Sequence, residues 1–183
     1  MTTTFRLEHD FPDIPIELYE KHLNHPELIA MLSAMPAFRS RVLVGKTDLG
    51  GGVIGWRFKV VAGGDIPLAA RRAVSEDMLT WHEDTRFVPN EHAIYWNIVP
   101  LSAKFREILD AKGTWKLTPH RFSDARGGST MGTRRVIEGN IHVKIPLIGK
   151  IVETYLAEEL KRNYAVEPDI QRKFYREIQA RGG

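Results

Sequence analysis

The chain has 183 residues, of which 43% are hydrophobic and 27% charged, and its net charge is +3. This composition excludes a largely disordered chain and fits a single domain, residues 1–183, large enough to hold a core and an internal cavity. The absence of cysteine excludes disulfides, thiolate nucleophiles and cysteine-ligated metals.

Apolar and polar residues alternate along much of the chain, which predicts an antiparallel sheet of about seven strands combined with helices. In chain order we expect a strand at 5–11, helices at 16–24 and 26–34, strands at 38–49 and 53–61, a helical connection at 66–74, strands at 78–88 and 91–99, a helix at 104–112, strands at 115–122 and 129–145, and helices at 147–163 and beyond Pro168. Pro146 ends the last strand, and Pro168 is expected to interrupt the terminal helix.

The segment from residue 133 to residue 164 carries the clearest pattern. In its strand Ile141 and Val143 alternate with polar neighbours such as His142, so one face is apolar and the other polar. In the helix that follows, apolar residues recur at three- and four-residue steps and predict a face that meets the sheet. The first members of this face are Ile148, Ile151, Val152 and Tyr155.

Three short motifs, Gly132-Thr133-Arg134, Glu138-Gly139-Asn140-Ile141 and the segment 143–149, resemble a bacterial family catalogued only as a domain of unknown function. With the order of elements, they are similar to the START-like superfamily (SRPBCC, helix-grip or birch-pollen-allergen-like proteins). The resemblance implies an α+β fold: a curved antiparallel sheet, two short helices after the first strand, and a long C-terminal helix over a hydrophobic cavity. It carries over no catalytic residue.

Five aromatic residues on the expected strands, and apolar residues of the last strand and helix, are candidates to line that cavity. The predicted ligand-binding residues are Trp56, Phe58, Trp81, Trp96, Trp115, Ile141, Val143, Ile148, Ile151, Val152, Tyr155 and His9. Large rings and indole N–H groups suit a pocket that orients a mostly apolar ligand. For each aromatic residue ordinary core packing is the competing interpretation, and the Tyr155 hydroxyl either meets a ligand or bonds elsewhere in the protein.

The remaining polar residues predict little chemistry. His22 and His25 lack a third ligand at the spacing of known zinc motifs, so neither a metal nor a cofactor is expected. Arg134 and Arg135 point to opposite faces, and one of them, if it faces inward, would suit an anionic headgroup. A surface role is sufficient for Glu83. Glu153 is interpreted as structural, since a carboxylate in the first turns of a helix is stabilised by the helix dipole.

The basic excess lies in the second part of the chain. Residues 1–100 contain 10 Lys and Arg against 13 Asp and Glu, whereas residues 101–183 contain 16 against 10. No run of adjacent basic residues exceeds two, so nucleic-acid binding is not expected; a solvated surface explains the excess, and a transient contact with an anionic membrane surface is the alternative. With no signal-peptide pattern and no transmembrane segment, a cytoplasmic protein is expected.

The sequence therefore predicts a protein, more readily a binder than an enzyme, that binds and transports one hydrophobic or lipid-like small molecule under its C-terminal helix. A polyketide-cyclase-like enzyme, with His9 and Tyr155 as acid and base in the same cavity, is one alternative. A noncatalytic regulatory interaction module is the other.

Overall fold

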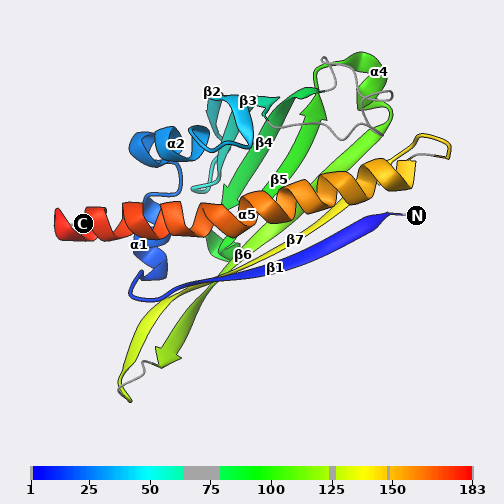
Figure 1. The fold of residues 1–183 in the computed structure, drawn as a ribbon. Helices are drawn as coiled ribbons and strands as arrows, with labels where there is room; N and C mark the ends of the chain where they lie inside the picture. The colour runs from blue at the N-terminus through cyan, green and yellow to red at the C-terminus, as the bar shows by residue number, and fades with distance from the viewer. Residues whose placement is uncertain (1, 64–78, 124–126, 148, 183) are drawn as a thin grey trace.

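In a computed structural model, the chain forms an α+β fold in which a long C-terminal helix accompanies an open antiparallel sheet (Figure 1). The structure describes residues 2–63, 79–123, 127–147 and 149–182. The strands are β1 (Thr3–Phe11), β2 (Phe38–Asp48), β3 (Ile54–Ala62), β4 (Thr80–Val88), β5 (Ala93–Pro100), β6 (Leu109–Ser123) and β7 (Ser129–Val143). The helices are α1 (Ile16–Lys21), α2 (Pro26–Ser33), α4 (Ala103–Arg106) and α5 (Gly149–Ala180), with a 3₁₀ turn η2 (Pro89–Glu91).

The sheet has seven strands in the order β1-β7-β6-β5-β4-β3-β2, and every neighbouring pair is antiparallel. From β2 to β7 the strands follow the sequence order, and β1 then pairs with the free edge of β7. The prediction of about seven antiparallel strands is thus confirmed. The helical connection expected at 66–74 lies outside the described residues.

The helix expected at 104–112 is formed only at its start. Only Ala103–Arg106 is helical, and β6 begins at Leu109, six positions before the predicted start. In this first part of β6, Leu109 and Ala111 pair with Val143 and Ile141 of β7. Pairing along the whole length of β7 outweighs the local helix propensity, because sheet formation depends more on cross-strand packing than on intrinsic preference.

The expected break at Pro168 is also wrong, because α5 is continuous from Gly149 to Ala180 with Pro168 inside it. Proline removes one helical hydrogen bond and costs about 3 kcal/mol in an isolated helix. The turns beyond it bury Phe174 and Tyr175 completely, and both belong to a core cluster with Phe11 and Tyr19. Packing of these turns is the reason that the helix continues.

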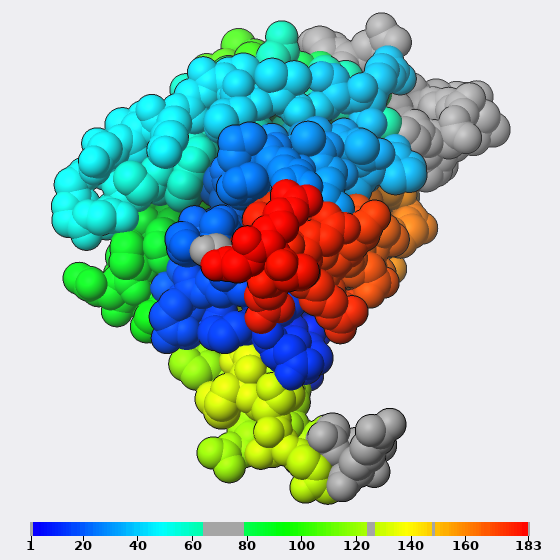
Figure 2. Space-filling view, turned by 90° about the vertical axis from the view of Figure 1, so that its left-hand side faces the viewer, coloured from blue at the N-terminus to red at the C-terminus, as the bar shows by residue number. Residues whose placement is uncertain are grey.

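The N-terminal and middle parts of α5 cross one face of the sheet (Figure 1). Its C-terminal part lies beside the first two helices (Figure 2), where the Tyr175 hydroxyl donates to the Tyr19 carbonyl at 2.9 Å and Arg181 pairs with Glu27. Its N-terminal part packs with Val152 and Ala157 against a second core cluster over β1, β5, β6 and β7. The candidate site lies beside this second cluster.

Candidate functional site: a cavity under the terminal helix

A cavity of about 230 Å³ lies between the inward face of the sheet and α5. Much of its wall is apolar: aromatic residues of β4, β5 and β6 form the sheet side, and aliphatic residues of α5 form the other. These residues are Trp81, Trp96, Trp115, Val152, Leu156 and Leu160. Such a concave, mostly apolar space with a few polar groups has the composition of a small-molecule site.

The structure places six of the sequence-predicted residues on the cavity wall: Trp81, Trp96, Trp115, Ile141, Val152 and Tyr155. Ile148 lies outside the described residues. Five others do not line the cavity: Trp56, Phe58, Val143, Ile151 and His9.

Each of these five has another environment. Trp56 packs against the core cluster that contains Phe174, and Val143 is buried in the cluster over β7. Phe58 is fully buried, with the Arg41 guanidinium 3.7 Å from its ring centroid. Ile151 is 58% exposed, because the stripe that meets the sheet runs through its neighbour Val152 instead. His9 belongs to the polar network described below.

A close approach of backbone and rings holds one residue of the cavity wall, Trp96, in place. Phe5, Gly139, Gly113 and Trp96 stand in one row across four strands. The Phe5 and Trp96 rings stack over this row with centroids 6.2 Å apart. A Cβ added at Gly139 would lie 2.6 Å from the Trp96 ring and 2.7 Å from the Phe5 ring, so only glycine fits under them.

The sequence analysis missed a polar pair on the wall. Arg41 of β2 and Glu83 of β4 both line the cavity, and Arg41 Nη2 donates to Glu83 Oε1 at 2.9 Å. A signal for Glu83 was present, because it stands two residues after Trp81 and side chains two apart on a strand share a face. The signal for Arg41 was weak, since register shifts interrupt the alternation in β2.

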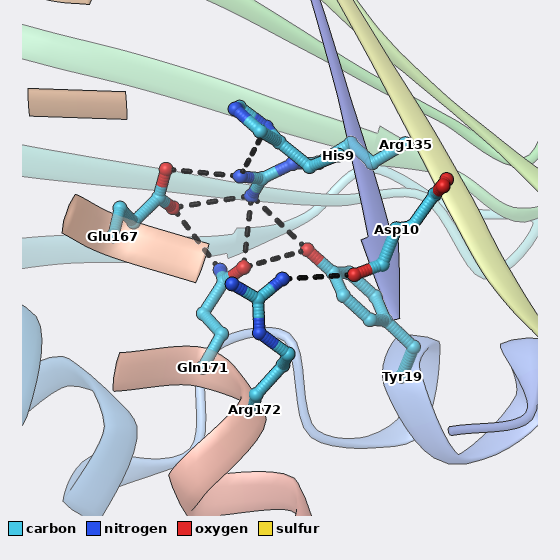
Figure 3. A network of polar contacts seen from close by, with 7 residues as sticks. All are labelled: His9, Asp10, Tyr19, Arg135, Glu167, Gln171 and Arg172. Carbon is cyan, nitrogen blue, oxygen red and sulfur yellow. Dashed lines mark hydrogen bonds and ion pairs between the residues drawn. The ribbon is translucent and has the colours of Figure 1, made fainter. Parts of the chain in front are cut away.

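Figure 3 shows a buried polar network centred on Arg135, which reaches the cavity through Glu167. The Arg135 side chain has no exposed surface, and its two terminal nitrogens donate to the Glu167 carboxylate at 3.2 and 3.1 Å. It also donates to the Tyr19 hydroxyl at 3.1 Å, to Gln171 Oε1 at 2.9 Å and to His9 Nδ1 at 3.0 Å. Of these five residues, Glu167 alone lines the cavity.

Burial and nearby charges shift the pKa values of His9 and Tyr19 in this network and of the neighbouring Tyr164. Burial, followed by the charges of Arg135 and Arg172, lowers the pKa of His9 to about 4. Burial raises the pKa of Tyr19 to about 12 and, with the nearby Glu167 carboxylate, moves the pKa of Tyr164 well above its ordinary value. At neutral pH the histidine is therefore neutral and both tyrosines keep their protons.

The inward arginine is thus Arg135, but its charge is already paired with Glu167 and is not free for an anionic headgroup. Arg134 points the other way and binds the Asp10 carboxylate through two hydrogen bonds of 2.7 and 3.0 Å. Sequence spacing separated the two faces correctly. It gave no sign of the internal carboxylate, which lies beyond residue 163, where the sequence analysis ended the helix.

Glu153 attaches the first turns of α5 to the sheet. Its side chain is buried, and it accepts hydrogen bonds from the Val143 backbone N–H at 2.9 Å, the Thr3 hydroxyl at 2.9 Å and His142 Nδ1 at 3.0 Å. Burial alone would raise the pKa of Glu153, but these hydrogen bonds and the nearby Lys150 hold it below its ordinary value. The carboxylate therefore stays ionised at neutral pH and holds the C-terminal end of β7 against the first turns of α5.

Two features are absent from the described part of the chain. None of its helices is long and apolar enough to cross a membrane. No group of three or more His, Asp or Glu side chains within that part is arranged to hold a metal ion.

Comparison with known proteins identifies a family whose function is not known. A family model described as "Protein of unknown function (DUF2505)" matches residues 7–174. No curated protein matches. Among solved structures, the crystal structure of TTHA0849 from Thermus thermophilus is similar with a TM-score of 0.57 and 17% sequence identity, over 99% of this chain and 100% of that chain. At this identity the likeness concerns the fold alone.

Proposed function

This chain belongs to the DUF2505 family of proteins of unknown function, and we propose that it binds one small, mostly apolar molecule in the cavity between its sheet and α5. The observation that carries the proposal is the cavity of about 230 Å³ with three tryptophans on its wall. The α+β order, with a terminal helix over an antiparallel sheet, fits the helix-grip arrangement of START-like ligand carriers and supports the same function.

The cavity volume narrows the class of ligand. An apolar cavity of about 150 Å³ holds benzene, and pockets for drug-sized ligands begin at about 300 Å³. A molecule of one or two rings, or a short alkyl chain, therefore fits the space of about 230 Å³. Burial of its apolar surface, at about 25 cal/mol per Å², provides the main driving force.

The charges around the cavity favour a ligand without net charge. Arg41 is paired with Glu83 in a partly buried ion pair, and Glu167 with Arg135 in a buried one, so a charged ligand would have to break one of these pairs. Asn163 of α5 also lines the cavity and supplies polar atoms that suit a hydroxyl or carbonyl group on the ligand. We infer a neutral ligand with one polar end.

Binding is favoured over the cyclase-like alternative. That alternative required His9 and Tyr155 in one cavity, whereas only Tyr155 lines it. The Glu167 carboxylate is occupied by Arg135 and Gln171. General acid-base catalysis works best with a pKa near the operating pH, and the pKa values of His9 and Tyr19 lie far from neutrality.

The test is a binding titration with a cavity-filling variant. We expect 1-naphthol, a neutral two-ring probe with one hydroxyl, to change the fluorescence of the wild-type tryptophans saturably. Leu156→Trp places an indole in the cavity and should lower the affinity for 1-naphthol at least tenfold without loss of thermal stability. Thr154→Trp, at an exposed position of the same helix, is the matched control and should bind like the wild type. Equal binding by the two variants would refute the proposal.

A further inference from the structure

The turn between β7 and α5 presents apolar side chains to solvent. Leu147 is fully exposed at 100% and has a positive φ of 66°, a conformation that is strained for a bulky residue. One helical turn further on, Ile151 is 58% exposed. Both side chains lie outside the core and away from the cavity wall, so the fold itself gives them no partner among the described residues.

Two lysines flank these side chains in the sequence, and a third lies on a neighbouring element. Lys144 precedes the turn, Lys150 follows it, and both are exposed. The short helix α4, which carries the exposed Lys104, lies at the same end of the molecule (Figure 1), where the Lys144 backbone N–H donates to the Ile108 carbonyl just after α4. We call Lys104, Lys144, Leu147, Lys150 and Ile151 the tip surface.

Acidic groups at this end offset part of that charge. Asp110 is held by Lys112 at 3.1 Å, and the buried Glu153 carboxylate lies 3.6 Å from Lys150, which also donates to the Thr3 hydroxyl at 2.7 Å.

Among the described residues no ion pair is formed by Lys104 or Lys144. Glu107 is the exposed carboxylate nearest to Lys104 in the sequence. An exposed apolar pair flanked by lysines matches an anionic bilayer, because apolar side chains enter the acyl region while the lysines reach the headgroups.

The tip surface adjoins the cavity through residues next to it in the sequence. Val152 lines the cavity and follows exposed Ile151, and Phe105 lines it and follows exposed Lys104. The same two short segments therefore face solvent on one side and the cavity on the other. A ligand that entered at this end would pass from bilayer to cavity with little exposure to water.

We propose that the tip surface docks onto anionic membranes and that the protein exchanges its apolar ligand there. Docking stands on the tip surface alone, whereas the exchange rests on the proposed function. The apolar pair provides the insertion, and each lysine adds a salt-sensitive attraction.

The experiment is co-sedimentation with vesicles of phosphatidylcholine containing 30% phosphatidylglycerol, against pure phosphatidylcholine. We expect binding to the anionic vesicles alone, weakened by 0.5 M NaCl. Leu147→Asn with Ile151→Gln should reduce it at least tenfold and leave the fold intact, since asparagine tolerates positive φ and glutamine suits an exposed helix. Val166→Gln, an equally exposed site of α5, is the control and should bind like the wild type. Lys104→Gln and Lys144→Gln should each cost about fivefold.

Other results would overturn the proposal. Equal binding by the double variant and the Val166→Gln control would remove the tip surface from the contact. A wild-type dimer that the double variant converts to monomer would make this face a contact between copies instead. The 1-naphthol titration of the wild type separates the two proposals. A wild-type protein that binds 1-naphthol but no anionic vesicles refutes docking only, and one that binds the vesicles but not 1-naphthol refutes the cavity only.

Discussion

The Arg135 guanidinium lies in the interior between two aromatic rings, 5.3 Å from the Phe11 centroid and 4.8 Å from the Trp115 centroid. A charge in such surroundings requires a partner, and Glu167 supplies it from a different element. Although burial opposes ionisation, the Glu167 carboxylate and further hydrogen bonds hold the pKa of Arg135 above its ordinary value. The pair therefore ties β7 to the middle of α5.

Removing one member of this pair should cost more than removing both. We expect Glu167→Met to lower the free energy of unfolding by about 3–5 kcal/mol, because it leaves the buried charge of Arg135 without a counter-charge. Arg135→Met combined with Glu167→Met should recover much of that loss. Urea unfolding with linear extrapolation measures both. A double variant less stable than the single one would show that the pair itself, not the orphaned charge, is what matters.

Glu153 makes the stability of the fold depend on pH in the acidic range. Its folded pKa is below the ordinary value, so its contribution is complete above the unfolded pKa of about 4.3 and is lost as the pH falls through the folded pKa. We expect thermal stability to fall in acid below about pH 4.3 and the fall to be smaller in Glu153→Gln.

Glu27 provides a comparison at the surface. Its pKa is also lowered, first by the hydrogen bond from Arg181, but this pair is exposed and salt should screen it. In 0.5 M NaCl, Glu27→Gln should titrate like the wild type while Glu153→Gln still differs. Identical acid profiles for all three proteins would contradict the role given to Glu153.

At the scale of elements, α5 holds the fold together although it contains a proline. Pro168 lies within the helix and is buried, directly after Glu167 of the buried pair. Because the turns on both sides pack against the sheet and the first helices, the missing hydrogen bond is tolerated. The helix should therefore gain stability when the bond is restored.

We expect Pro168→Ala to raise the free energy of unfolding by about 1 kcal/mol, less than the ~3 kcal/mol of an isolated helix, since the smaller side chain leaves a void and the unfolded chain gains freedom. Urea unfolding gives the value. Val166→Ala, at an exposed position of the same turn, should change stability by less than about 0.5 kcal/mol. A clear loss of stability in Pro168→Ala would mean that the ring fills a space that the core needs.

How far the sequence predicted these elements depended on the range of the forces involved. Alternation gave the strands, because the inward face of a half-buried strand is a local pattern. The start of β6 was missed because it depends on pairing with β7. The continuity of α5 was missed because it depends on packing of Phe174 and Tyr175 against α1. In the cavity, the tryptophans were predictable from their faces, whereas the pairing of Arg135 with Glu167 joins residues 32 positions apart on different elements.

At the scale of the whole molecule, one row of residues across the sheet relates its shape to the cavity. Phe5, Gly139, Gly113 and Trp96 belong to β1, β7, β6 and β5, and the two glycines let the rings lie close to the backbone. Trp96 is then both a core residue and part of the cavity wall. Its position thus sets how much space is left under α5.

A methyl group at Gly139 should disturb this arrangement from inside. In Gly139→Ala the new Cβ would stand 2.6 Å from the Trp96 ring, so the ring must move. We expect a loss of about 1–3 kcal/mol in unfolding free energy, as for other overpacked cores, together with weaker 1-naphthol binding and a shifted tryptophan emission.

Gly55→Ala in β3 is the matched control for Gly139→Ala. A Cβ there would have its nearest neighbour at an ordinary 3.7 Å, and strand interiors gain from replacing glycine, so Gly55→Ala should be neutral or slightly stabilising and should bind the probe normally. Gly139→Ala could instead have the same unfolding free energy and the same affinity for 1-naphthol as Gly55→Ala. The Trp96 ring would then have enough space to accommodate the added methyl group. The row would then not control the cavity, because the sheet could absorb the added methyl group elsewhere.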